Sequence, residues 1–153
     1  MPADNVTPFR RPPPKRVQQR QQGGLGLKSH RGKAMLVHLL TLAAFALNFV
    51  FPTGLQSYLG MGVGIGAGLL AYSNRFDSMP WAATHHEHVF RTLLIGYSIW
   101  TIASALTFVN GMLVMVAFFV HLAVILWAVI RSGIGLVLAA MRRPIPRPRG
   151  WLI

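Results

Sequence analysis

The sequence predicts an all-α polytopic membrane protein, a four-transmembrane-helix bundle that follows a disordered basic N-terminal arm. Composition is the first observation: 53% of the 153 residues are hydrophobic and only 12% are charged, whereas a soluble domain carries about a quarter charged residues. The second is a series of four apolar segments, each long enough at about 1.5 Å per residue to cross a hydrocarbon core of about 30 Å. The third is the placement of the positive charges, which gather near the ends of the chain.

Residues 1–33 form the basic arm, which has few apolar side chains beside a triple proline and a Gln/Arg run. Because so little apolar surface is available to offset the entropy of ordering, we expect a disordered segment on the cytoplasmic side. Each Lys or Arg near an anionic bilayer contributes about 1 kcal/mol of attraction, which makes anionic lipids an expected partner. The arm carries eight of the fifteen basic residues, namely Arg10, Arg11, Lys15, Arg16, Arg20, Lys28, Arg31 and Lys33.

The four expected spans are separated by short turns and one longer loop. They cover residues 34–51, 55–72, 89–109 and 112–130, with turns at 52–54 and 110–111 and a polar middle loop at 73–88. After the fourth span, the run Ser132-Gly133-Ile134-Gly135 is expected to break or bend the helix. Residues 131–153 then form a basic, proline-rich cytoplasmic tail, which is expected to be extended because its prolines cannot continue a helix.

The distribution of Lys and Arg predicts the topology. Neither expected short turn contains a basic residue, whereas the arm has eight, the middle loop with the helix start has two, and the tail has five. All fifteen therefore fall on one side of a four-span arrangement. The positive-inside rule therefore places both termini and the middle loop of this multi-pass protein in the cytoplasm.

Glycines repeat through the second expected span in two rows. One row has a spacing of four residues and the other lies about 200° away around the helix. Glycine rows let helix backbones approach closely in a membrane, so two rows predict two neighbouring helices, either within the bundle or at an oligomer seam. A pore or a flexible hinge is the functional alternative. The first row is Gly60, Gly64 and Gly68, and the second is Gly62 and Gly66.

Two histidines lie inside expected spans, His38 about one turn into the first and His121 near the middle of the fourth. Ionisable groups within a membrane are candidates for function, and the alternative is a neutral imidazole that bonds a hydroxyl or carbonyl of a neighbouring helix. Their expected depths differ by about 9 Å at about 1.5 Å per residue. That difference is awkward for two axial ligands of one haem, so we expect no cofactor.

The middle loop holds a polar cluster that runs from Thr84 to Arg91. Glu87 and Arg91 are four residues apart and can pair on a helix, and His85 and His88 would share a face that could hold a surface metal ion. Two adjacent ligands are fewer than such a site needs. The favoured interpretation is therefore a capping box, with Thr84 as the N-cap and Glu87 at the third position of the helix.

The same cluster resembles a family of small bacterial four-helix membrane proteins, without an assigned activity, that is related to the Tic-type component of the chloroplast inner-envelope import channel. The resemblance covers roughly residues 34–151 and implies four spans in a bacterial membrane, but no catalytic residue. Glu87 and His88 depart from it, because bulky or basic residues are more typical there. The residues that carry it are Thr84-His85, Arg91-Thr92, Ile95-Gly96, Arg131, Gly133, Pro144 and Trp151.

Several classes of function remain for such a chain. We expect a non-enzymatic structural, accessory or assembly subunit of a larger inner-membrane complex, with other membrane subunits or further copies of the chain as partners. The alternative is a component of a translocation or transport channel that acts as an oligomer. An enzyme is not expected, because Glu87 is the only acidic residue near a membrane face, and the absence of cysteine excludes thiolate and iron–sulfur chemistry. Nucleic acid is not an expected partner, because no aromatic stacking platform accompanies the basic arm.

Overall fold

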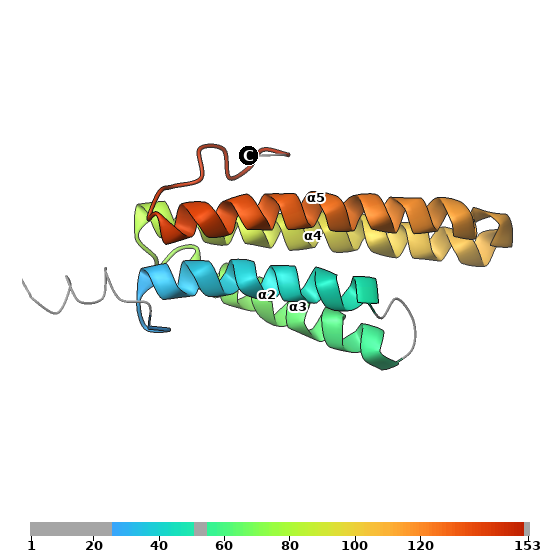
Figure 1. The fold of residues 1–153 in the computed structure, drawn as a ribbon, viewed down its shortest axis with the longest axis horizontal. Helices are drawn as coiled ribbons and strands as arrows, with labels where there is room; N and C mark the ends of the chain where they lie inside the picture. Colours follow the sequence, from blue (N-terminus) through green and yellow to red (C-terminus); the bar gives the residue numbers. More distant parts are fainter. Residues whose placement is uncertain (1–25, 51–54, 152–153) are drawn as a thin grey trace, which may run out of the picture.

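The computed structural model describes residues 26–50 and 55–151, and these residues fold as two helical hairpins that lie side by side (Figure 1). The first hairpin consists of α2 (His30–Val50) and α3 (Leu55–Asn74), and the second of α4 (Pro80–Val109) and α5 (Val114–Ala140). A 3₁₀ turn, η1 (Gly111–Leu113), leads into α5. No strand occurs in the described residues, so the all-α prediction is confirmed for them.

Three of the described helices are long and apolar enough to cross a membrane: α2, α4, and α5 together with η1. Helix α3 is not among them. Five of its twenty residues are glycine, and glycine contributes little apolar surface. The prediction of a membrane protein is therefore supported by three helices, while the second expected span is helical as predicted but is not one of the three.

Two predicted helix boundaries are wrong. Helix α4 begins at Pro80, before the expected N-cap at Thr84 and the expected span start at residue 89, so most of the expected middle loop is helical. Proline fits the first helical turn because its missing N–H needs no partner there. Helix α5 continues through Gly133 to Ala140, where a break was expected. A glycine within a helix costs about 1 kcal/mol, and at Gly135 it lets α5 approach the ring of His38 on α2.

The N-terminal arm lies mostly outside the described residues, as does the turn at 52–54. Its last residues, which were expected to be disordered, belong to α2, because this helix begins at His30 rather than at residue 34. The side chain of Ser29 accepts a hydrogen bond from the N–H of Gly32 at 2.9 Å and thereby satisfies one free donor of the first turn.

The core lies between the two hairpins and is built largely from small and β-branched side chains. Phe45 is its largest fully buried hydrophobic residue. Its ring stacks on Tyr97 with 5.4 Å between ring centroids, and the missing side chain of Gly96 leaves space for it. The buried members are Val37, Phe45, Ala67, Ala71, Val89, Leu93, Val124, Ile125 and Ala128.

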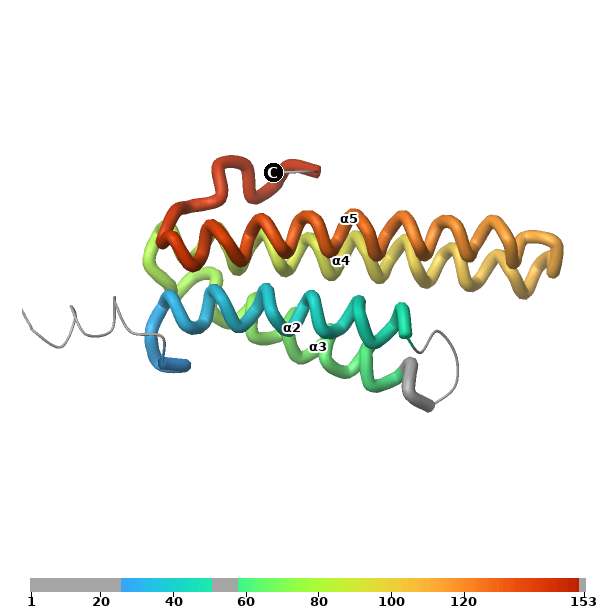
Figure 2. The backbone as a smooth tube through the Cα atoms, in the orientation of Figure 1, coloured from blue at the N-terminus to red at the C-terminus, as the bar shows by residue number. Residues whose placement is uncertain are grey.

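The α4–α5 hairpin extends well beyond the α2–α3 hairpin at one end of the bundle (Figure 2). Asn48, two residues before the end of α2, donates a hydrogen bond to the hydroxyl of Tyr97 on α4. Helix α4 continues for twelve residues to Val109, which is about 18 Å at about 1.5 Å per residue. The projecting tip is strongly apolar, with Phe108 90% exposed and Met112 86% exposed.

The C-terminal tail does not extend freely from α5. It turns at Arg142, whose φ is 56°, and runs back along the helix bundle (Figure 1). Ile145 is buried, and its N–H donates to the hydroxyl of Thr84 at 3.0 Å. The indole of Trp127 donates to the carbonyl oxygen of Trp151 at 2.8 Å. The proline-rich run is non-helical, as predicted, but it lies against α4 and α5.

Candidate functional site

The densest group of ionisable and polar side chains lies at the end of the bundle where α2 and α4 begin and α5 ends. Four histidines, here called the histidine cluster, are at most 1% exposed: His38, His85, His86 and His88. One comes from α2 and three from the first turns of α4. The spacing in sequence predicts that His85 and His88 share a helix face, and both turn inward towards His38.

A chain of hydrogen bonds links α2, α4 and the tail through two of these rings. His85 Nε2 lies 2.8 Å from the carbonyl oxygen of Arg143, which can only accept a hydrogen bond, so this nitrogen carries the proton. In a neutral His85 ring, Nδ1 is then an acceptor, and it receives the Nε2–H of His38 at 3.1 Å. The tail backbone thereby determines the tautomers of both rings.

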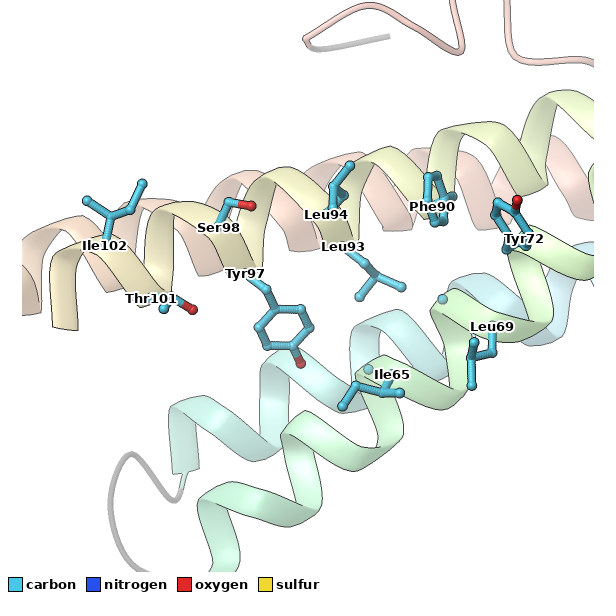
Figure 3. A pocket seen from close by; sticks show the side chains of 12 residues that line it. Ile65, Leu69, Tyr72, Phe90, Leu93, Leu94, Tyr97, Ser98, Thr101 and Ile102 are labelled. Carbon is cyan, nitrogen blue, oxygen red and sulfur yellow. The ribbon is translucent and has the colours of Figure 1, made fainter. Parts of the chain in front are cut away.

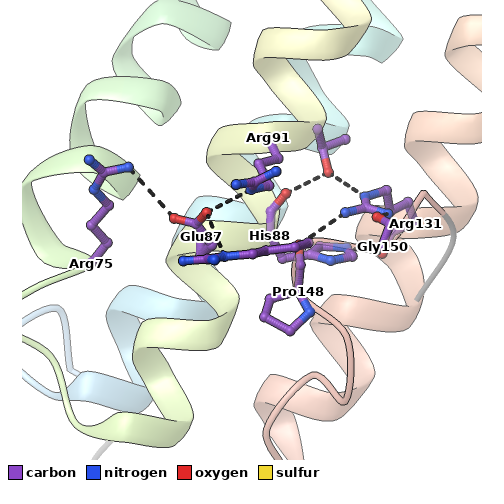
Figure 4. Close-up of polar contacts among 9 residues, drawn as sticks. Arg75, Glu87, His88, Arg91, Arg131, Pro148 and Gly150 are labelled. Atoms are coloured by element: carbon purple, nitrogen blue, oxygen red, sulfur yellow. Dashed lines mark hydrogen bonds and ion pairs between the residues drawn. The ribbon is translucent and has the colours of Figure 1, made fainter.

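Arg131 connects the cluster to the returning tail (Figure 4). Its Nε donates to the hydroxyl of Thr92 at 2.8 Å, and that hydroxyl donates to the carbonyl oxygen of His88 at 2.7 Å. The guanidinium also donates to the carbonyl oxygens of Gly150 at 2.6 Å and Pro148 at 3.4 Å. Arg131 is only 1% exposed, so a basic residue expected to mark the membrane boundary instead holds the tail onto the bundle.

Glu87 lies at the rim of this site and is shared by three arginines (Figure 4). The predicted pair with Arg91 is confirmed, with Nε 2.6 Å from the carboxylate. Arg75, from the loop after α3, approaches to 3.6 Å, and Arg149 of the tail approaches to 3.9 Å. Three guanidinium groups around one carboxylate leave a formal excess of two positive charges.

The predicted capping box is wrong. Helix α4 is capped at Met79, without a side-chain hydrogen bond, so Thr84 lies inside the helix. Its hydroxyl donates to the carbonyl oxygen of Trp81 at 2.7 Å and accepts the N–H of Ile145. Glu87 binds arginines instead of the helix N-terminus. The pattern of a capping box is only four residues long, and the preceding proline provides an earlier start for the helix.

A metal ion does not fit the cluster in this arrangement. His85 and His88 are buried rather than at a surface, and no three His, Asp or Glu side chains of the described residues are arranged to hold a metal. The His85 nitrogens bond to His38 and to a backbone carbonyl. His86 finds no hydrogen-bond partner for either ring nitrogen among the described residues. As placed, the rings of His38 and His85 connect α2, α4 and the tail rather than present a reactive group to solvent.

His121 lies far from the cluster, between α4 and α5. Its ring stacks on Trp100 with 3.9 Å between centroids, and Nε2 is 3.2 Å from both the Trp100 carbonyl oxygen and the Ser104 hydroxyl. His38 instead bonds His85. The two histidines expected inside spans therefore have different neighbours, and His121 has the contacts of an imidazole that bonds a neighbouring helix.

The two glycine rows of α3 have different surroundings. A side chain added at Gly60 would overlap Asn48 of α2, and one added at Gly64 would overlap Tyr97 of α4. At Gly68 the nearest atom would be a methyl group of Leu93 at 3.8 Å. The first row therefore faces the bundle, as predicted. For Gly62 and Gly66, no described atom lies within 4 Å of an added Cβ, so this row has no neighbour in the described chain.

Two close approaches and most of the polar contacts are not predicted by the sequence. Gly96 makes room for Phe45, and Gly135 makes room for His38. The run that contains Gly135 predicts a break or bend in the helix, because its sequence neighbours say nothing about a helix some hundred residues away. A small residue within an apolar segment was the only available signal.

Comparison of this chain with protein-family models, with curated proteins and with solved structures found no match. The structural evidence on function therefore comes from the geometry above.

Proposed function

We propose that this chain is a non-enzymatic integral membrane protein that serves as a small structural, accessory or assembly subunit of a larger complex in a bacterial inner membrane. It crosses the membrane four times, with α3 as the fourth span, and both termini face the cytoplasm. Membership in the Tic-related family stays a prediction based on the sequence motifs.

The open glycine row on α3 is the observation that carries this proposal. Gly62 and Gly66 leave a smooth strip along the helix, and Leu59 on the same side is 62% exposed. Backbones approach closely at such strips, and this close contact drives helix association in a bilayer, where apolar side chains gain little from leaving lipid. A helix of another subunit fits this strip.

The proposal of a non-enzymatic role is supported by how the polar groups are used. Catalysis needs a nucleophile, acid or base that a substrate can reach. His38, His85 and His88 are buried and turned towards helices or the tail, while Glu87 is neutralised by arginines. These contacts hold α2, α4, α5 and the tail together, so the polar groups have a structural role.

The orientation is supported by the separation of charge and apolar surface along the bundle. Arg75, Arg91 and Arg131 lie towards the end that holds the histidine cluster, whereas Phe108 and Met112 lie at the exposed tip between α4 and α5. At about 1.5 Å per residue, α2 and α3 match a hydrocarbon core of about 30 Å, whereas the longer α4–α5 hairpin must tilt or extend beyond it. Such a mismatch costs fractions of a kcal/mol per Å.

The test is affinity capture of the full chain, tagged at its N-terminus because the C-terminal tail lies against the bundle. Native membranes are solubilised gently, and companions are quantified by mass spectrometry for the wild type, Gly66→Leu and Gly133→Leu. Gly133 is the matched control, since it is also open but lies on α5. We expect a constant set of membrane subunits that only Gly66→Leu loses.

The outcomes separate the two classes of function. Recovery as a homo-oligomer without other subunits would support the transport alternative. Recovery as a monomer, or equal loss of companions in both variants, would refute the assignment of the α3 strip as a subunit contact.

A further inference from the structure

A groove between α3 and α4 opens on the outer surface of the bundle (Figure 3). It has a volume of about 760 Å³, and the two helices diverge along it. On the α3 side its wall includes Gly64 and Gly68. Its lining does not include Gly62 or Gly66, so it is distinct from the α3 strip.

The length of the groove is close to the thickness of the hydrocarbon layer of one membrane leaflet. Its lining on α4 runs from Phe90 to Ile102, which is about 18 Å at about 1.5 Å per residue. Half of a hydrocarbon core of about 30 Å is about 15 Å. Leu69 and Leu94 are more than half exposed along its walls. A groove of this length and apolar character fits a single extended acyl chain that enters from one side of the membrane.

The mouth of the groove carries positive charge. Tyr72 and Phe90 line this end, and the guanidinium of Arg75 lies over both rings, 4.3 Å and 5.3 Å from their centroids. The Nε of Arg75 is buried and has no hydrogen-bond partner among the described residues. Arg91 lies close by, because it shares Glu87 with Arg75. Even with the exposed Asp77 included, the arginines around Glu87 outnumber the carboxylates.

We propose that the α3–α4 groove binds an anionic phospholipid of the cytoplasmic leaflet, with one acyl chain between the helices and the phosphate at Arg75. An acyl chain matches the apolar walls, and a phosphate matches the excess positive charge that Arg75 and Arg91 leave around Glu87, because arginine forms charge-assisted hydrogen bonds with phosphate oxygens. A transmembrane helix is a poorer occupant, because an apolar helix offers no anion to the arginines at the mouth of the groove.

The experiment uses the full chain in detergent, delipidated and then titrated with phosphatidylglycerol or phosphatidylcholine, with bound lipid counted by native mass spectrometry. We expect the wild type to retain phosphatidylglycerol preferentially. Arg75→Gln should weaken its retention about fivefold, the effect of one basic residue at an anionic headgroup. Arg147→Gln removes the same charge from an exposed position that lines no part of the groove, and should leave retention unchanged.

A second variant tests the acyl-chain site independently of charge. Ser98 is exposed within the groove, so Ser98→Phe fills it without replacing a buried residue. It should abolish retention while circular dichroism shows an intact helical fold. A phosphatidylglycerol with a photoreactive acyl chain should crosslink to α3 and α4 residues of the groove in the wild type only.

Three results would overturn the proposal. These are equal retention of the two lipids, unchanged retention in both Arg75→Gln and Ser98→Phe, or a change of oligomeric state in Ser98→Phe, which would assign the groove to a second copy of the chain. None of these results depends on the companions captured through Gly66. Failure of the lipid site is therefore distinguishable from failure of the subunit contact.

Discussion

The substitution Gly64→Ala tests whether α3 is held in place through its inner glycine row. A methyl group at this position would overlap the ring and hydroxyl of Tyr97. That hydroxyl donates to the carbonyl oxygen of Gly60 and accepts from Asn48, each at 3.2 Å. The ring also stacks on Phe45. We expect the tyrosine to be displaced and all three contacts to be lost.

The magnitude follows from those contacts. Two intramembrane hydrogen bonds contribute about 0.6 kcal/mol each, and an aromatic pair contributes about 0.5–1.5 kcal/mol. Their loss amounts to about 2–3 kcal/mol in the free energy of unfolding. Gly62→Ala is the matched control, because its methyl group meets no described atom. Both variants gain the same helix propensity, about 1 kcal/mol, so the difference between them isolates the contacts of Tyr97.

The assay is reversible unfolding of the purified chain in mixed micelles, followed by circular dichroism during a titration with sodium dodecyl sulfate. The unfolding equilibrium constants of Gly64→Ala and Gly62→Ala should differ by a factor of about thirty or more, the equivalent of about 2 kcal/mol. Double substitution with Tyr97→Phe should reduce the difference. Equal stability of the two glycine variants would refute the assignment of the inner and outer rows.

Three further predictions concern topology, the tail and the intramembrane imidazole. In intact cells, a cysteine introduced at Thr53 or at Asn110 should react with a membrane-impermeant maleimide, while one introduced at Ser78 should not. Labelling at position 110 without labelling at position 53 would mean that the α2–α3 hairpin does not cross the membrane. Ile145→Ala should release the tail, since truncating a buried isoleucine costs about 2–5 kcal/mol. Trypsin should then cleave after Arg142 and Arg149, the tail arginines that no proline follows, much faster than in the wild type. Unchanged cleavage would contradict tail burial. His121→Ala should lower the free energy of unfolding by about 1 kcal/mol, because it removes one ring stack and a long hydrogen bond. A loss of stability larger than that of Gly64→Ala would reverse the ranking of these two contacts.

The features that were predicted correctly from the sequence are those that depend on neighbouring residues along the chain. The apolar runs predict helices because a helix must bury or embed such a surface wherever it lies. The pair of Glu87 and Arg91 follows from a spacing of four residues, and the structure confirms it at 2.6 Å. The shared face of His85 and His88 follows from helical geometry in the same way.

The signals that failed were overruled by partners distant in sequence. Thr84 has the pattern of an N-cap, yet it lies within α4 because the helix begins at Pro80 and the tail residue Ile145 bonds its hydroxyl. Gly133 and Gly135 have the pattern of a helix end, yet α5 continues because Gly135 gains a close contact with His38. No local pattern distinguishes these cases.

By itself, the sequence determined the helical class, the apolar character of three helices and the asymmetry of positive charge, because composition and periodicity follow from neighbouring residues. Only the tertiary structure decided that Gly60 and Gly64 face the bundle while Gly62 and Gly66 face outward. It also placed the histidine cluster inside and returned the tail to Arg131. These outcomes depend on which helix lies opposite each residue, and a chain acquires such neighbours only when its hairpins come together.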